Sequence, residues 1–165
     1  MEPNEALGIA AQVAVTLAGF AGVVVVFRPE ALHQWSALDK FRLQLLLTNS
    51  VLPLLYSLLG MLLLTVHPPI ADIWRWSSGV AFVTQILLIV FGGNPVRRIP
   101  TGQLHGINKV LFYGIAVLGT AAMALQAINF ARWNWFWPFF AFIFVHLIAA
   151  VLQFMRMVLL VPEKE

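Results

Sequence analysis

The chain has 165 residues, of which 61% are hydrophobic and only 10% are charged, and its mean hydropathy is +0.87. Soluble domains have about 45–50% apolar and about 25% charged residues, so this composition excludes a soluble domain of typical size and indicates a protein surrounded by lipid. The absence of cysteine excludes disulfides, and the net charge of +3 predicts no nucleic-acid partner, because the basic residues flank apolar segments.

Five apolar segments are long enough to cross a membrane as helices, since a spanning helix needs about 20 mostly apolar residues. In chain order they cover residues 7–27, 43–66, 74–91, 109–131 and 138–161. Continuous apolar runs such as residues 23–26 contradict the alternation that a transmembrane β-barrel requires. The predicted fold is therefore all-α: a polytopic transmembrane helix bundle with five membrane-spanning helices that form one domain over residues 1–165.

The distribution of basic residues predicts the orientation of this bundle. With the N-terminus outside and the C-terminus inside, eight basic residues lie on the inner side and two, Arg75 and Arg132, on the outer side. Positive charge is retained on the cytoplasmic side of membranes, so the asymmetry favours this N-out/C-in topology and a multi-pass protein of the cell inner (plasma) membrane. The eight inner residues are Arg28, Lys40, Arg42, Arg97, Arg98, Lys109, Arg156 and Lys164.

Most of the tryptophans fall in the second and fourth connections, both on the predicted outer side. Indole rings prefer the headgroup level of a bilayer, so these residues are expected to form an anchoring belt. A sharper interpretation is an aromatic platform for a lipid or a partner. The residues are Trp74, Trp76, Trp133, Trp135 and Trp137.

Several polar residues lie inside the predicted spans, where they are candidates for a ligand site or a polar path. His146 lies well inside the last segment, and Gln153 follows on the same helical face. Asn49 and Tyr56 flank Pro53 in the second segment, and Gln85 lies in the third. Interhelical hydrogen bonds without a further function are the alternative for each of them. The sequence predicts no metal site and no cofactor.

Small residues recur at every fourth position of the first segment: Ala10, Ala14, Ala18 and Gly22. Such a stripe allows close helix approach, either inside the bundle or in a homo-oligomer. In the first connection, Leu32, Trp35 and Leu38 follow helical spacing, which predicts a short helix in the membrane interface. In the third connection, Arg97 and Arg98 are candidates for binding anionic headgroups.

Three runs resemble a loosely defined group of short bacterial membrane proteins of unknown function. They are residues 18–27, the spacing Trp35-x-x-x-Asp39-x-x-Arg42, and residues 73–78, Ile-Trp-Arg-Trp-Ser-Ser. The resemblance covers the first half of the chain and implies a bacterial origin. It implies no chemical activity.

These features leave three functions open. A non-enzymatic structural or accessory bundle is the leading hypothesis, because no catalytic constellation is present. A small oligomeric transport or channel subunit, with a polar path near His146, is the first alternative. A haem- or lipid-handling membrane protein is the second.

The predicted orientation can be tested with a reporter fused after Glu165. We expect a reporter that functions only in the cytoplasm to be active when fused after Glu165, because the basic residues keep the C-terminus on the cytoplasmic side. A fusion that is active only in the periplasm would overturn the topology.

Overall fold

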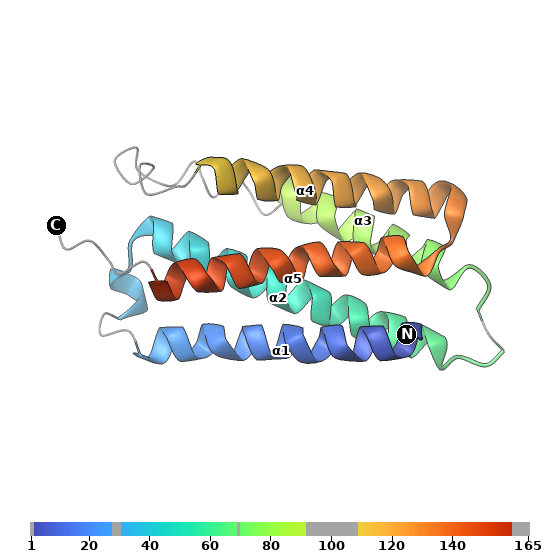
Figure 1. The fold of residues 1–165 in the computed structure, drawn as a ribbon, viewed down its shortest axis with the longest axis horizontal. Coiled ribbons are helices and arrows are strands. Elements are labelled where there is room, and N and C mark those ends of the chain that lie inside the picture. Colours follow the sequence, from blue (N-terminus) through green and yellow to red (C-terminus); the bar gives the residue numbers. More distant parts are fainter. Residues whose placement is uncertain (1, 28–30, 69, 92–108, 160–165) are drawn as a thin grey trace.

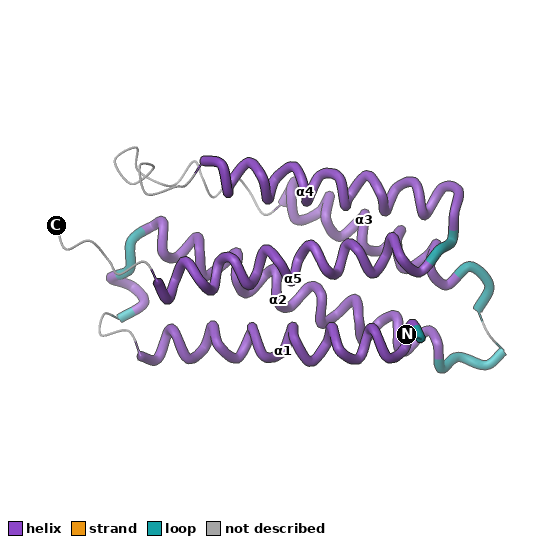
Figure 2. The backbone as a smooth tube through the Cα atoms, in the orientation of Figure 1, coloured by secondary structure: helices purple, strands orange, loops and turns teal. Residues whose placement is uncertain are grey.

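The computed structural model describes residues 2–27, 31–68, 70–91 and 109–159, and within these ranges it contains five long helices and no strand (Figures 1 and 2). Two short segments join them: the 3₁₀ turn η1 (Leu32–Gln34) and the π-helical turn η4 (Asn129–Trp133). Each long helix is apolar enough to cross a membrane, which confirms the predicted all-α, multi-pass membrane protein. The helices are α1 (Pro3–Phe27), α2 (Ala37–Leu64), α3 (Ile73–Phe91), α4 (Lys109–Ile128) and α5 (Phe136–Leu159).

The second helix begins earlier than the sequence predicted. It starts at Ala37 instead of residue 43, because the Ser36 hydroxyl accepts a hydrogen bond from the Asp39 amide at 3.0 Å and caps the first turn. The expected separate interfacial helix is therefore wrong. Its Trp35 and Leu38 are buried, whereas Leu32 is 47% exposed, so the three side chains do not share one face.

Helix α5 is the centre of the bundle. Half of its membrane-spanning window (50%) is buried, against 33% or less for each other helix. It packs against α1, α2 and α4, and Figure 1 shows it between α1 and α4. Its buried face consists mainly of large apolar side chains: Phe139, Phe142, Ile143, Leu147 and Met157.

The stripe of small residues on α1 is only partly buried. Ala10 and Ala14 are buried within the chain, where their small side chains allow close helix approach. Ala18 is half-buried and Gly22 is exposed, because the buried face turns to Leu17 and Ala21. A homo-oligomer through the stripe stays a prediction, and only its Ala18 and Gly22 end is open to a second copy.

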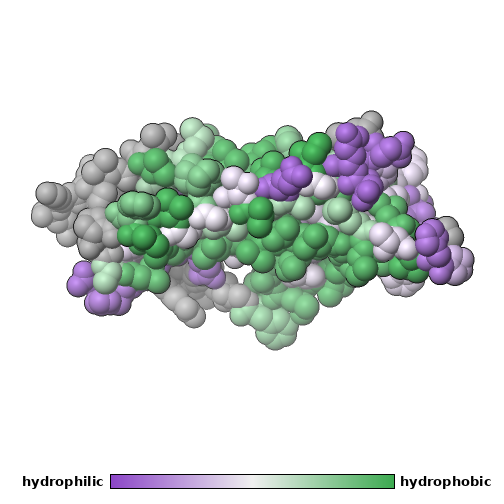
Figure 3. Space-filling model, turned by 90° about the horizontal axis from the view of Figure 1, so that it is seen from below, coloured by the Kyte–Doolittle hydropathy of each residue, from purple (hydrophilic) through white to green (hydrophobic). Residues whose placement is uncertain are grey.

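The surface of the bundle matches its membrane setting. In the face shown in Figure 3, apolar side chains cover most of the middle and hydrophilic ones gather toward the two ends. A lipid-facing surface requires this distribution, because hydrocarbon cannot solvate polar groups. The five apolar helices and this surface together indicate an integral membrane protein.

The start of α3 is tied to the turn between α4 and α5 by two asparagines. Asn134, in the left-handed conformation (φ 59°), accepts a hydrogen bond from the Arg75 amide at 2.9 Å and donates one to Asp72 at 2.9 Å. Asn129 is fully buried; its Nδ2 donates to Ser78 Oγ at 2.7 Å and its Oδ1 accepts from the Trp135 amide at 2.9 Å. We call these contacts the asparagine network. It fixes α3 against α4 and α5 at one end of the bundle.

The asparagine network gives a stability prediction. Replacing Asn129 by Ala leaves the buried Ser78 hydroxyl and the Trp135 amide without this partner, at a cost of about 1–3 kcal/mol for each unsatisfied group. We expect Asn129→Ala to lower the free energy of unfolding in mixed detergent micelles by at least about 2 kcal/mol.

The control for that measurement is Gln12→Ala, which truncates an exposed amide on α1. Surface substitutions of this kind change stability by about 0.5 kcal/mol or less. Equal effects of the two substitutions would show that the network does not hold the helices together.

Candidate functional site

Four polar residues, one from each of four helices, line a single cavity. They are Asn49 of α2, Gln85 of α3, Thr120 of α4 and His146 of α5. The cavity has a volume of about 320 Å³, and the rest of its lining is mainly apolar, with Leu45, Ile115, Met123, Phe142 and Val145 among its residues. Three of the five polar-path candidates from the sequence therefore come together in space.

The cavity lies near the middle of the helices that form it. His146 is ten residues into α5, or roughly 15 Å at the usual helical rise. Asn49, Gln85 and Thr120 also lie in the central turns of their helices. These groups are thus remote from both aqueous surfaces, where polar residues are costly and often functional.

His146 and Asn49 form the one hydrogen-bonded side-chain pair across the cavity wall among the described residues. His146 Nδ1 lies 2.7 Å from Asn49 Oδ1, and Asn49 Nδ2 donates to the Leu45 carbonyl at 2.8 Å. The Leu45 contact identifies Oδ1 as the acceptor, so His146 Nδ1 carries the proton. A neutral imidazole then keeps Nε2 as a hydrogen-bond acceptor.

The imidazole is also held by packing. Its ring meets the Phe142 ring edge to face, with 4.6 Å between the ring centroids, and only 8% of the residue is exposed. The Asn49 hydrogen bond and the Phe142 contact together restrict the orientation of the ring. His146 is therefore preorganised for binding at a fixed position in the cavity wall.

Gln85 and Thr120 complete the polar lining. The Thr120 hydroxyl donates to the Ala116 carbonyl at 2.8 Å, which leaves its oxygen lone pairs as acceptors. The Oε1 atom of Gln85 is buried and has no hydrogen-bond partner among the described residues. A buried acceptor without a donor is unfavourable. The atom is covered by the chain itself, so a bound donor reaches it only when the Gln85 side chain turns toward the cavity.

The other two candidates from the sequence lie elsewhere. Tyr56 is buried, packs against the rings of Phe139 and Phe142 and does not line the cavity. Gln153 is buried further along α5, and its Oε1 also lacks a hydrogen-bond partner in the described part of the chain. The predicted path from His146 to Gln153 is therefore not part of this cavity.

The five predicted belt tryptophans lie together at one end of the bundle, which we call the tryptophan end. Trp76, Trp135 and Trp137 are exposed, as a belt requires. Trp133 stacks on Trp135 with 5.2 Å between ring centroids, whereas Trp74 packs inward on Phe136 and Phe139. Lipid contact through these residues stays a prediction, and Arg97 and Arg98 lie outside the described residues.

Comparison with known proteins adds no function to this geometry. The chain matches no protein-family model, no curated protein and no solved structure. Within the described ranges, no group of three or more His, Asp or Glu side chains is placed to hold a metal ion. The cavity is the site on which a functional proposal has to rest.

The pairing of His146 with Asn49 can be measured by a double-mutant cycle with Asn49→Val and His146→Leu. Hydrogen bonds between membrane helices contribute about 0.6 kcal/mol on average and up to about 1.7 kcal/mol. We expect a coupling energy in this range from unfolding in mixed micelles.

Asn49→Val combined with Gln153→Leu is the matched control. The amide of Gln153 does not contact Asn49, so the two effects are expected to add to within about 0.5 kcal/mol. A coupling energy near zero for the His146 pair would show that the 2.7 Å contact does not stabilise the protein.

Proposed function

We propose that the protein is a non-enzymatic, lipid-handling membrane bundle that binds a lipophilic molecule with a hydroxyl-bearing head in the cavity between α2, α3, α4 and α5. The observation that carries this proposal is the set of neutral hydrogen-bond acceptors at mid-membrane depth. His146, Gln85 and Thr120, each of which carries a hydrogen-bond acceptor, line one cavity, and a hydroxyl group is a donor that remains soluble in lipid.

The size and lining of the cavity support this class of ligand. Small-molecule sites are mostly apolar, contain a few fixed polar groups and have volumes of about 300–1,000 Å³. At about 320 Å³ this cavity suits a head of one ring or a short branched group. The apolar side chains around it suit hydrocarbon attached to that head.

The same geometry gives less support to a transport path. No Asp, Glu, Lys or Arg in the described part of the chain lines the cavity, and Gln153, which would continue a path along α5, lies outside it. Ion-coupled carriers use charged or carboxylate groups at this depth. An enzyme would likewise need an acid and a base that converge on one point.

A haem is also poorly supported by the described residues. His33 and His67 are exposed and lie outside the five helices, so neither is beside His146. Among the described histidines, His146 is thus left with no second imidazole for bis-histidine ligation.

The proposal includes the bacterial inner membrane as the location, with the N-terminus outside. The eight-to-two division of basic residues supports this orientation. The tryptophan end then faces outward, and the end with Lys40 and Arg42 faces the cytoplasm.

Glycine substitutions on α4 test the proposal. Gly119 lines the cavity, and a Cβ atom added there meets no atom within 4 Å, so the backbone accepts a side chain at this position. We expect the leucine of Gly119→Leu to occupy part of the cavity. Leucine also favours helix over glycine. We expect mass spectrometry of extracts from the purified protein to find one hydroxyl-bearing lipophilic molecule with wild type, reduced at least tenfold in Gly119→Leu.

Gly114→Leu is the matched control. Gly114 is on the same helix, also meets no atom within 4 Å and does not line the cavity. This variant is expected to retain the molecule at the wild-type level. Extracts that contain only bulk membrane lipids, or equal amounts of the molecule from both variants, would contradict the proposal.

A further inference from the structure

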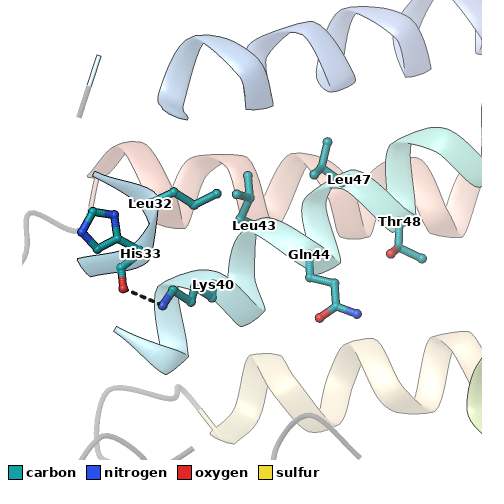
Figure 4. A pocket seen from close by; sticks show the side chains of 7 residues that line it. All are labelled: Leu32, His33, Lys40, Leu43, Gln44, Leu47 and Thr48. Carbon is teal, nitrogen blue, oxygen red and sulfur yellow. Dashed lines mark hydrogen bonds between the residues drawn. The ribbon is translucent and has the colours of Figure 1, made fainter. Parts of the chain in front are cut away.

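A second, larger hollow lies at the opposite end of the bundle from the tryptophans, along the first turns of α2. It has a volume of about 700 Å³, and none of its lining residues lines the cavity around His146. Figure 4 shows the side chains that line it. Leu32 of η1 and Leu43 and Leu47 of α2 form its apolar side. We call it the α2 groove.

The other side of the α2 groove is polar. Lys40, Gln44 and Thr48 are four residues apart and therefore share one face of α2. Figure 4 shows these three side chains on one side and the three leucines on the other. From Lys40 to Thr48 the groove follows α2 for roughly 12 Å, so it runs from the helix start into the membrane-spanning part.

The Lys40 ammonium is the cationic group of the α2 groove, and it lies at the mouth of the groove. The Lys40 ammonium donates to the His33 carbonyl at 3.0 Å, which holds it at the mouth. An ammonium has three N–H donors, so two remain for a ligand. The neighbouring Asp39 carboxylate is 3.3 Å from the Arg42 guanidinium, and no carboxylate of the described residues lines the groove.

Among the described residues, the surrounding end of the bundle carries more positive than negative charge. Arg42 and Arg156 lie near enough to one another to interact electrostatically. Together with Lys40 they make three basic residues, against the one described acidic residue beside them on α2, Asp39. An anionic group at the mouth of the groove is therefore electrostatically favoured, and a cationic one is disfavoured.

From this arrangement we propose that the α2 groove binds an anionic phospholipid. The phosphate contacts the Lys40 ammonium at the mouth, where a headgroup lies when α2 crosses the membrane. Gln44 and Thr48 supply hydrogen bonds at the depth of the glycerol esters. An acyl chain packs on Leu43 and Leu47, with Leu32 closing the apolar side near the mouth.

Binding is tested with the full chain purified in neutral detergent and stripped of lipid. Dioleoyl phosphatidylglycerol and dioleoyl phosphatidylcholine are added in turn, and the dissociation constant of the first bound lipid is measured by native mass spectrometry. We expect the anionic lipid to bind about fivefold more tightly, the effect of about one basic residue near an anionic headgroup. Equal affinities for the two lipids would overturn the proposal.

Two substitutions separate the headgroup contact from the acyl contact. Lys40→Gln is expected to weaken phosphatidylglycerol binding about fivefold, to the level of phosphatidylcholine, and Lys40→Arg is expected to preserve the preference. Leu47→Trp places a bulky ring in the groove at a position that is 39% exposed, and it is expected to weaken both lipids. A Lys40→Gln variant that retains the preference would overturn the assignment.

Arg132→Gln is the matched control for charge. Arg132 is exposed at the tryptophan end, so its loss removes one positive charge far from the groove and is expected to leave the preference unchanged. Glycerol phosphate is the control for a free anion. If it displaces phosphatidylglycerol at equal concentration, the site recognises phosphate without the acyl chain, and the phospholipid proposal is wrong.

Discussion

Hydrocarbon offers no hydrogen-bond partner, so the polar side chains inside these helices depend on the chain itself for one. Short side chains find it locally: Ser50 Oγ donates to the Leu46 carbonyl at 2.7 Å, one turn earlier. The amides reach between helices: Gln126 Nε2 donates to the Pro138 carbonyl at 2.8 Å, and Asn129 joins α3 to the start of α5. In lipid, apolar packing alone is weakly specific for the relative position of two helices. The hydrogen bonds of Gln126 and Asn129 therefore help to determine how α3, α4 and α5 pack against one another.

The same requirement makes the unsatisfied groups informative. Gln85 and Gln153 each have a buried Oε1 atom without a hydrogen-bond partner among the described residues. Gln85 lines the cavity that also contains His146 and Thr120, so a rotation of its amide toward the cavity lets a bound molecule supply the missing donor. Gln153 lies outside that cavity. The two glutamines thus differ in whether a cavity lies beside them. Gln85 is a candidate for ligand binding, whereas Gln153 is a packed residue.

The sequence predicted five helices because length and apolarity alone determine which segments can cross lipid. It also singled out His146, Asn49 and Gln85, since a polar residue within an apolar run is visible locally. It could not show that these residues share one cavity with Thr120, because that depends on how four helices are arranged. The roles of Asn129 and Asn134 were missed for the same reason: their partners on α3 are more than 50 residues away in sequence. Ser36, by contrast, carried a local capping signal ahead of Asp39 that marks the true start of α2.

The unequal lengths of the helices couple the protein to the thickness of its membrane. Helix α2 has 28 residues and α3 has 19, which correspond to about 42 Å and about 28 Å at the usual rise. A hydrocarbon layer of about 30 Å accommodates α3 upright, whereas α2 must tilt or extend beyond the layer. Figure 1 shows α2 crossing obliquely. Because Lys40 is in the first turn of α2, its height relative to the phosphates changes with bilayer thickness, so a thicker or thinner membrane alters which headgroup atoms it meets.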